Sequence, residues 1–350
     1  MDDKSQLDNN TWFSSLLLRI FTGATSLHDA ADSGSQEQVD SLIKKGVNID
    51  AKTYDGWTAL HHAVKNGYMD IIETLLIKGA NVNVRLRWPT RGATPLHIAV
   101  EHGRKDIAEL LISNGTNVNL LSKDGAPLHI AAYNDFIDII ELLLDNDAII
   151  NNSTGTNLTP LHFAVSSGAE KAIQLLIFRG ANLHDKNSDG LTPLHVACFE
   201  DRISIVKGLV NCGANLYDRA KDGLTPLHIA AMYGFIDLVD FFINKGADVN
   251  IKADNDATPL NLAAHEGHLD VVRYLISVGA DVNAKTKDGM TSLHAASLKN
   301  YKDIAEFLIQ HGADVNAKYW NRYTPMQMAS DKGFRNVAEL IKKHGGMKHY

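Results

Sequence analysis

The sequence of 350 residues has few cysteines, no excess of basic residues and no long apolar run. Cys198 and Cys212 are its only cysteines, so it has no disulfide framework, and two thiols suit a reducing compartment. Lys and Arg number 34 against 41 Asp and Glu, which gives a formal net charge of -7. This balance disfavours nucleic acid or an anionic membrane as the main partner.

The start of the chain lacks a secretory signal of the usual kind. Asp2, Asp3 and Asp8 occupy the region in which such a signal carries positive charge. The apolar stretch from Trp12 to Phe21 is interrupted by polar residues and is too short to span a bilayer. We therefore expect a cytoplasmic protein. Delivery to a host cell by a route that needs no signal is the alternative.

Motifs typical of enzymes are also missing. The sequence has no G-x-G-x-x-G, P-loop, G-x-S-x-G or Cys-x-x-Cys pattern. His265-Glu266-Gly267-His268 is one residue short of the metalloprotease pattern, and Gly267 places the two histidines on different helices. We predict no catalytic residue, no cofactor and no metal, and we interpret the chain as non-enzymatic.

The chain is filled instead by ten copies of one phrase, Thr-Pro-Leu-His or a near copy of it. The copies begin at Thr25, Thr58, Thr94, Ala126, Thr159, Thr192, Thr225, Thr258, Thr291 and Thr324. Their spacing is 33 residues except for a step of 36 after Thr58 and a step of 32 after Thr94. A fixed period of this length predicts a solenoid, in which each unit completes its core against its neighbours.

The copy that begins at Thr225 predicts two helices joined by a turn. Thr225 suits an N-cap whose hydroxyl accepts from an amide of the first turn, and Pro226 suits the first helical position. Gly234 suits the left-handed end of this helix, and a second helix is expected from about Ile236 to Asn244. Asp, Asn and Gly residues before the next Thr predict a tight turn at the tip of a projecting hairpin.

This pattern resembles the ankyrin repeat, whose period of 33 residues and T-P-L-H-x-A signature it shares. The Thr, Leu, His and Ala positions, the helix-ending Gly and the Gly-Ala-x-Val-Asn tail recur together from about residue 22 to 349. The resemblance implies an all-α repeat solenoid of helix-turn-helix units, with β-hairpin fingers along one edge and the first helices on a concave face. Members of this family mostly bind other proteins through these two surfaces.

We predict a single ankyrin-repeat domain of ten units over residues 22–350, after an N-terminal segment of residues 1–21. Apolar residues from Trp12 to Phe21 recur on one helical face, so a helix is expected to cap the first repeat. A membrane-surface anchor is the rival reading, and the acidic flanks disfavour it. The C-terminal cap is expected to end in cations that suit a helix C-terminus: Lys342, Lys343, His344 and Lys348.

Four turn positions depart from glycine. Asp135, Asp201 and Asn300 replace the glycine between two helices, and Asp147 replaces the glycine after a second helix. Asp and Asn are the non-glycine residues that best tolerate left-handed geometry, so these turns are expected to survive. The fourth copy has two of the replacements and lacks one residue, so we expect the stack to be weak or bent between residues 120 and 156.

Eight of the sixteen histidines hold the same repeat position: His28, His61, His97, His129, His162, His195, His228 and His294. Packed helices lie about 8–10 Å apart, so imidazoles one repeat apart cannot share a zinc ion at about 2 Å per bond. We interpret each ring as structural, hydrogen-bonded to a neighbouring hydroxyl or backbone group. Asn261 and Gln327, which replace it in two copies, can also form hydrogen bonds. We interpret Cys198 as a small buried side chain.

Partner specificity is expected at exposed variable positions, because the core positions are fixed. Large apolar groups occupy the two residues after the Ala pair of several first helices: Tyr133, Phe199, Met232, Tyr233 and Leu298. We hypothesise that Phe199, Met232 and Tyr233 form the centre of a protein-binding surface flanked by the other two. The rival reading is that these side chains pack on adjacent helices.

An insertion of three residues supplies a second candidate. The finger between Asn83 and Thr94 carries Arg and Trp residues at an expected exposed tip: Arg85, Arg87, Trp88 and Arg91. These residue types are preferred interface anchors, and the charge suits an acidic or phosphorylated partner. An idle loop is the alternative, since long loops cost little stability, and a single basic tip is a poor track for nucleic acid. Weaker candidates are Tyr54 and Trp57 in an early finger, and Trp320 and Tyr323 in the last.

Together these features predict a non-enzymatic protein-protein interaction scaffold or adaptor that acts as a monomer. The competing function is a secreted effector or toxin component that acts on host-cell proteins or membranes, because pathogens and venoms also carry long ankyrin arrays. Fractionation of cells with and without a secretion system would separate these two functions.

Overall fold

The computed structural model describes residues 23–87 and 92–347. Within these ranges the chain forms twenty α-helices in ten consecutive pairs, with no β-strand. The predicted all-helical repeat architecture is therefore confirmed. The predicted capping helix of residues 12–21 and Lys348 lie outside the described residues. The described residues divide into two compact units, the first ending at residue 182 and the second beginning at residue 183. The single continuous domain stays a prediction.

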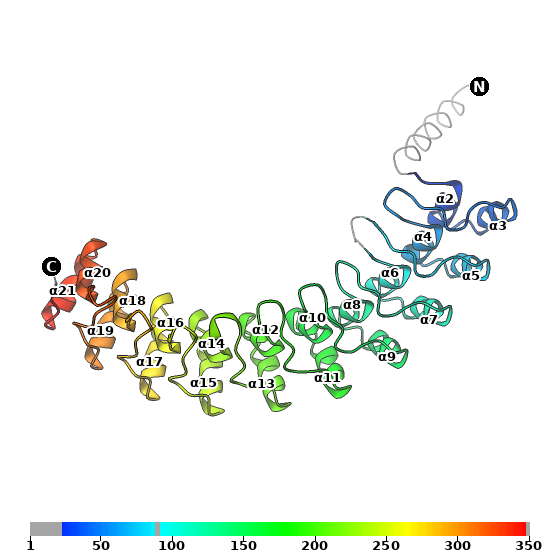
Figure 1. Cartoon of the computed structure of the whole chain (residues 1–350). Coiled ribbons are helices and arrows are strands. Elements are labelled where there is room, and N and C mark those ends of the chain that lie inside the picture. The colour runs from blue at the N-terminus through cyan, green and yellow to red at the C-terminus, as the bar shows by residue number, and fades with distance from the viewer. Residues whose placement is uncertain (1–22, 88–91, 348–350) are drawn as a thin grey trace, which may run out of the picture. The chain divides into compact units, whose positions relative to one another are not determined.

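The first unit contains five helix pairs (Figure 1). The first helices of its pairs are α2 (Ser26–Asp32), α4 (Ala59–Asn66), α6 (Pro95–Glu101), α8 (Pro127–Tyr133) and α10 (Pro160–Ser167). The second helices are α3 (Gln36–Lys44), α5 (Met69–Ile77), α7 (Lys105–Ser113), α9 (Ile137–Asp145) and α11 (Glu170–Phe178). Within this unit the first helices lie side by side in one row, and the second helices form another row.

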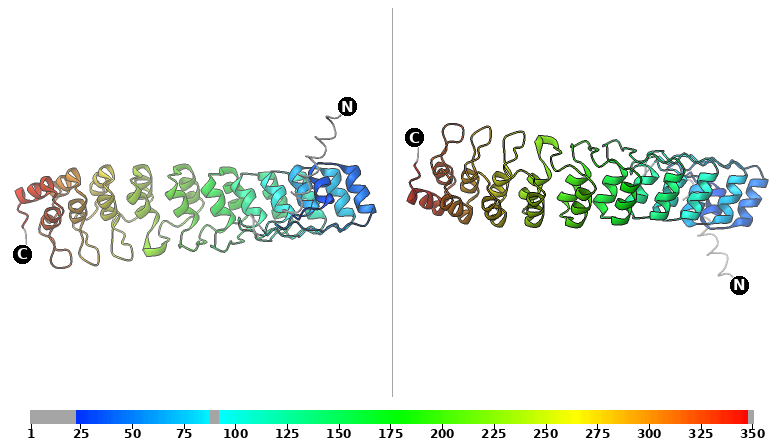
Figure 2. Two further views of the ribbon diagram at one scale, coloured as in Figure 1. Left: turned by 90° about the horizontal axis from the view of Figure 1, so that it is seen from above. Right: turned by 90° about the horizontal axis from the view of Figure 1, so that it is seen from below.

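The second unit repeats this arrangement with five more pairs. Its first helices are α12 (Pro193–Phe199), α14 (Pro226–Tyr233), α16 (Pro259–Glu266), α18 (Ser292–Lys299) and α20 (Pro325–Asp331). Its second helices are α13 (Ile203–Asn211), α15 (Ile236–Asn244), α17 (Leu269–Ser277), α19 (Lys302–Gln310) and α21 (Arg335–Lys343), and a short 3₁₀ turn covers Lys221–Gly223. Figure 2 shows that the fingers of this unit project beyond the helices on one side.

The helix boundaries follow from local chemistry. Pro226 starts α14, where its missing N–H leaves no helical bond unmade, and Gly234 ends that helix at a φ of 78°. The same left-handed turn is made by Asp135, Asp201 and Asn300, whose φ values are 57°, 50° and 63°. The prediction that these turns keep their left-handed geometry without glycine is therefore confirmed. Asp147, after a second helix, likewise has a φ of 64°.

Asp135 has a further structural role in the fourth copy. Its Oδ1 accepts from the backbone N–H of Ala172 at 2.7 Å, so it binds one of the unpaired amides in the first turn of α11. A carboxylate at a helix N-terminus also interacts favourably with the helix dipole. This bond offsets part of the cost of the missing glycine, and the weakness expected near residues 120–156 stays a prediction.

Several of the recurring histidines are hydrogen-bonded to the finger of the next repeat: His28, His97, His129, His195, His228 and His294. In the copy at Thr225, the Nδ1 of His228 accepts from the Thr225 N–H at 3.2 Å, and its Nε2 donates to the carbonyl of Ala257 at 3.1 Å. The Thr225 hydroxyl lies 2.8 Å from the same Nδ1, in a capping box that joins Thr225 and His228 at the start of α14. The hydroxyl accepts from a first-turn amide at distances from 3.2 to 3.5 Å in Thr58, Thr159, Thr258, Thr291 and Thr324, as predicted for the N-cap. The structural interpretation of the histidines is confirmed.

The two replacements of this histidine behave differently. Asn261 copies the histidine, because its Oδ1 accepts from the Thr258 N–H at 3.0 Å and its Nδ2 donates to the Ala284 carbonyl at 3.2 Å. Gln327 instead donates to Asp331 on its own helix at 3.1 Å. Asn261 therefore links two repeats, whereas the side-chain bond of Gln327 stays within one.

The fingers are hydrogen-bonded turns rather than extended hairpins. In the described residues, only isolated bridges form, between Ser122 and Gly125 and between Tyr319 and Tyr323. Neighbouring fingers are joined by backbone bonds, such as the Asp254 N–H to the Asp222 carbonyl at 2.9 Å. The predicted fingers are present, but strand pairing contributes little to them.

An asparagine at the end of the Gly-Ala-x-Val-Asn tail also links adjacent repeats. The Oδ1 of Asn283 accepts from the N–H of Asp314 at 2.8 Å, and its Nδ2 donates to the carbonyl of Gly312 at 3.0 Å. Tyr217 holds this position in another repeat, and its hydroxyl donates to the Gly246 carbonyl at 2.8 Å. The side chain at this position thus satisfies a carbonyl at the end of the next repeat's second helix.

Replacing Asn283 by Ala is expected to lower the free energy of unfolding by about 1–2 kcal/mol, because two hydrogen bonds between repeats are lost at an exposed site. Urea titration followed by circular dichroism measures the loss. Asn244→Ala is the matched control, since the Asn244 side chain bonds only to Asp240 on its own helix. Equal losses in the two variants would contradict a role for Asn283 between repeats.

Candidate protein-binding surfaces

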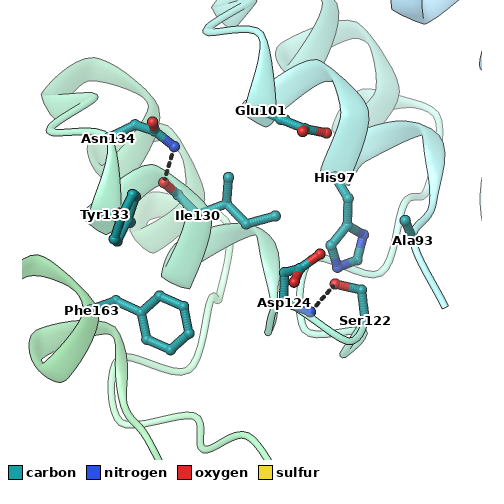
Figure 3. Close-up of a pocket in the computed structure, with 9 residues that line it drawn as sticks. All are labelled: Ala93, His97, Glu101, Ser122, Asp124, Ile130, Tyr133, Asn134 and Phe163. Carbon is teal, nitrogen blue, oxygen red and sulfur yellow. Dashed lines mark hydrogen bonds between the residues drawn. The ribbon is translucent and has the colours of Figure 1, made fainter. Parts of the chain in front are cut away.

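Tyr133 lies at the end of α8 and lines a cavity of about 370 Å³, which we call the Tyr133 groove (Figure 3). Its side chain is 52% exposed. Ile130 from α8 and Phe163 from α10 lie on the same side of the groove, and the rings of Tyr133 and Phe163 meet edge to face at 6.5 Å. These three side chains form an apolar wall open to solvent.

The facing side of the Tyr133 groove is polar (Figure 3). Glu101 ends α6, and Asp124 lies in the finger, where its N–H donates to the Ser122 hydroxyl at 3.2 Å. His97 donates from Nε2 to the Gly125 carbonyl at 3.1 Å, and burial lowers the pKa of its ring to about 4. Because His97 is neutral at pH 7, the charge of this side comes from the two carboxylates.

The sequence indicated Tyr133 but not Ile130 or Phe163 as residues of this surface. Both occupy the variable position between His and Ala in the Thr-Pro-Leu-His-x-Ala phrase. The prediction used the exposed, variable pair that begins three positions further along. Phe163 is the only phenylalanine among the ten residues at this position, and that departure is the signal that marks it.

In the second unit, the structure brings Phe199 and Tyr233 together. Their rings meet edge to face with centroids 5.6 Å apart, and Tyr233 stacks on Phe235 at 5.9 Å. Tyr233 is 47% exposed, and Phe199 is half-buried. We call these three residues the Phe199 cluster. Phe235, just before α15, was not predicted.

The other residues of the predicted central surface are not in ring contact with the Phe199 cluster in the described contacts. Met232 is half-buried, and its carbonyl accepts from Nε2 of His268 at 2.9 Å. Leu298 is half-buried on α18. Tyr133 belongs to the first unit and is described with its own groove. A surface that combines all five residues stays a prediction.

One arginine of the inserted finger is hydrogen-bonded to backbone carbonyls of the chain itself. The guanidinium of Arg85 donates from Nε to the Gly92 carbonyl at 3.3 Å and from Nη2 to the Leu121 carbonyl. Arg87 is exposed, and its backbone N–H donates to the Asp55 carbonyl at 2.7 Å. Trp88 and Arg91 lie outside the described residues. Arg85 therefore has a structural role that the sequence did not indicate.

The remaining aromatic candidates lie on fingers. Tyr54 is exposed, while Trp57 is half-buried beside a smaller cavity described below. Trp320 is exposed in the last finger with a left-handed φ of 52°, and its backbone N–H donates to the Asp288 carbonyl at 2.8 Å. The ring of Tyr323 lies under the guanidinium of Arg322 at 5.3 Å. Binding at these tips stays a prediction.

No group of three or more His, Cys, Asp or Glu side chains in residues 23–87 and 92–347 could hold a metal ion. In the same ranges, no helix combines the length and apolar character that crossing a bilayer requires. Cys198 is fully buried, and burial raises the pKa of its thiol. Its interpretation as a packed side chain is confirmed.

The part of the chain that the structure describes has ten helix pairs, with fingers between them and side chains exposed along the first helices, and this arrangement defines a helical-repeat protein. A family model described as ankyrin repeats (3 copies) matches overlapping stretches of the chain: residues 7–86, 27–122, 96–187, 128–220, 161–253, 200–286, 227–319 and 279–349. The chain therefore belongs to the ankyrin-repeat family. No curated protein matches it with statistical significance.

Solved structures agree on the fold. The human ASB11 ankyrin repeat domain is similar with a TM-score of 0.56 and 23% sequence identity, over 64% of this chain and 100% of that chain. Identity at this level shows the fold alone. Ankyrin repeats in general mediate protein-protein interactions, and their fold is typically a non-enzymatic binding scaffold.

Proposed function

We propose that this chain is a non-enzymatic scaffold that binds a partner protein through the Tyr133 groove. The observation that carries this proposal is an exposed aromatic side chain at the wall of a cavity of about 370 Å³. Tyrosine is enriched among the residues that dominate interface energies, and such residues lie in pockets that exclude water on binding. A largely preformed groove also reduces the ordering cost of association.

The two sides of the groove indicate the chemistry of the partner. A large apolar side chain would pack against Ile130, Tyr133 and Phe163, whose rings offer both faces and edges. A nearby lysine or arginine of the partner would face Glu101 and Asp124, which adds electrostatic complementarity at the rim. We therefore expect a partner segment with an apolar anchor next to a basic residue.

The Phe199 cluster supports a second contact surface. It combines an exposed tyrosine with two further rings in a fixed edge-to-face and stacked arrangement. Aromatic groups are enriched at interface centres, and stacking already limits the motion of these rings. The Tyr133 groove and the Phe199 cluster lie in different units, so variants of each test them separately.

Tyr133→Ala is expected to weaken the binding of the partner by more than about 2 kcal/mol, or roughly 30-fold, because it removes the central side chain of the apolar wall. The partner is first obtained by affinity capture from native cytosol, and the dissociation constant is then measured by calorimetry. Phe178→Ala is the matched control, since Phe178 is 85% exposed at the end of α11, away from the groove. An unchanged affinity in Tyr133→Ala would remove the groove from the proposal.

A cytoplasmic location completes this proposal. It is supported by the two unpaired cysteines, one of them buried, which suit a reducing compartment. Cell fractionation with an antibody against the chain tests the location. Recovery of the protein from the culture medium in cells with an intact secretion system, and not without one, would contradict it.

A further inference from the structure

A second cavity in the first unit has a different chemistry from the Tyr133 groove. It measures about 250 Å³ and lies beside α2, α4 and the finger between them. We call it the Trp57 pocket, and its principal side chains are Asp29, Asp32, Asp55, Trp57, His62 and Lys65. Three carboxylates and an indole ring thus border one small cavity.

The wall of the Trp57 pocket is held in place by hydrogen bonds. The carbonyl of Trp57 accepts from Nε2 of His28 at 3.0 Å, which fixes the backbone that carries the indole. Asp32 accepts from Nδ1 of His62 and from Nδ2 of Asn66, each at 3.0 Å. The His62 ring lies 5.0 Å from the indole. The carboxylate and the ring therefore have defined positions before any ligand arrives.

The chain itself already places a cation at this indole. The Nζ of Lys65 lies 5.6 Å from the centre of the Trp57 ring, within the distance at which an ammonium is attracted to an aromatic face. Lys65 is exposed at the end of α4, and a long exposed side chain is easily displaced. Among the described residues that line the pocket, one ammonium stands against three carboxylates, an excess of negative charge at pH 7.

We infer that the Trp57 pocket binds an arginine side chain of the partner segment, which displaces the Lys65 ammonium from the indole. This inference rests on the proposed function, because it assigns a second anchor to the same class of partner. A guanidinium is planar, stacks on aromatic rings and forms forked bonds to carboxylates, so it suits an indole next to carboxylates better than an ammonium does. The indole face and the excess negative charge both select a cation.

The test uses a synthetic peptide, acetyl-Gly-Gly-Arg-Gly-Gly-amide, and full-length protein labelled with ¹⁵N. The indole N–H resonance of Trp57 is assigned by its loss in Trp57→Phe, and its shift is followed as peptide is added. A saturable shift is expected with the arginine peptide. The matched peptide with citrulline, which has the same shape without the charge, is expected to shift this resonance at least fivefold less.

Variants locate the effect in the pocket. Asp29→Asn combined with Asp55→Asn is expected to weaken the binding of the arginine peptide at least fivefold, since two of the three carboxylates lose their charge. Asp70→Asn combined with Glu73→Gln makes the same change in net charge on α5 and is expected to leave the binding unchanged. Lys65→Met is expected to strengthen the binding severalfold, because the competing ammonium is removed.

Two outcomes would overturn this inference. One is an equal shift with the citrulline peptide, and the other is equal binding by the pocket variant and the α5 control. The inference and the proposed function fail separately. The peptide reports on the Trp57 indole alone, whereas Tyr133→Ala reports on the affinity for the whole partner.

Discussion

Acidification from pH 7 to pH 5 is expected to lower the free energy of unfolding of the repeats strongly, even though carboxylates remain largely ionised over this range. The cause is the set of buried histidines. Burial lowers the pKa to about 4 for five of them: His97, His129, His195, His228 and His294. For His61 burial lowers the pKa to about 3.

The hydrogen bonds of these rings also oppose protonation. In His228, Nε2 must carry a hydrogen because it donates to the Ala257 carbonyl, and Nδ1 must be bare because it accepts from the Thr225 N–H. A proton added to Nδ1 would face that N–H at hydrogen-bonding distance and break the bond. The neutral ring is thus the only form that satisfies both neighbours.

The direction of the pH dependence follows from the lowered pKa values. The unfolded chain, with a histidine pKa near 6.5, binds more protons than the folded chain between pH 6.5 and about 4, so stability is complete above this window and falls within it. At pH 5 each of the five rings lowers the free energy of unfolding by about 2 kcal/mol, so together they remove a large part of the stability of a typical domain.

Urea titrations at pH 7, 6 and 5 measure this dependence, and His228→Asn supplies its control. Asn261 shows that an asparagine can make the same two kinds of bond without a titrating group. Between pH 7 and pH 5, the free energy of unfolding of the variant is expected to fall by about 2 kcal/mol less than that of the natural chain. Identical pH profiles for the two proteins would contradict the role assigned to the histidines.

Local chemistry allowed most of the fold to be predicted. The residues that start and end helices, such as Pro226 and Gly234, act through their own backbone geometry, and α15 spans the range expected from the sequence. The left-handed turns at Asp135 and Asn300 were predictable for the same reason. Helix ends and turns that depend on a residue and its immediate neighbours can be predicted without knowing how the repeats pack against one another.

Contacts between repeats were harder to predict, because they depend on which side chains meet across the stack. Phe163 joins Tyr133 only because α8 and α10 pack side by side, and Arg85 reaches a carbonyl of the following finger. His61 also differs from its equivalents. Its buried Nε2 makes no hydrogen bond to the next finger among the described residues, whereas His228 donates to the carbonyl of Ala257. A repeat pattern alone specifies none of these contacts.

A substitution in the core of the second unit is also expected to lower the stability strongly. The site is one of two adjacent phenylalanines of α15. Phe242 is fully buried and is among the largest side chains in the interior of the described chain. Phe241 is half-buried on the same helix, with the ammonium groups of Lys207 and Lys245 at 5.9 and 5.7 Å from its ring. The two side chains are identical, but one is fully buried and the other is partly exposed to solvent.

Phe242→Ala is expected to lower the free energy of unfolding by about 3–5 kcal/mol, because the lost burial of the ring adds to the cost of a cavity that the stacked helices cannot close. Phe241→Ala is expected to cost about 1 kcal/mol, since its ring is already partly in water and its contacts with the two lysines are weak. Urea titration followed by circular dichroism compares both variants with the natural chain. Similar losses would mean that α15 presents Phe242 to something other than a close-packed core, and the packing of the second unit would have to be reconsidered.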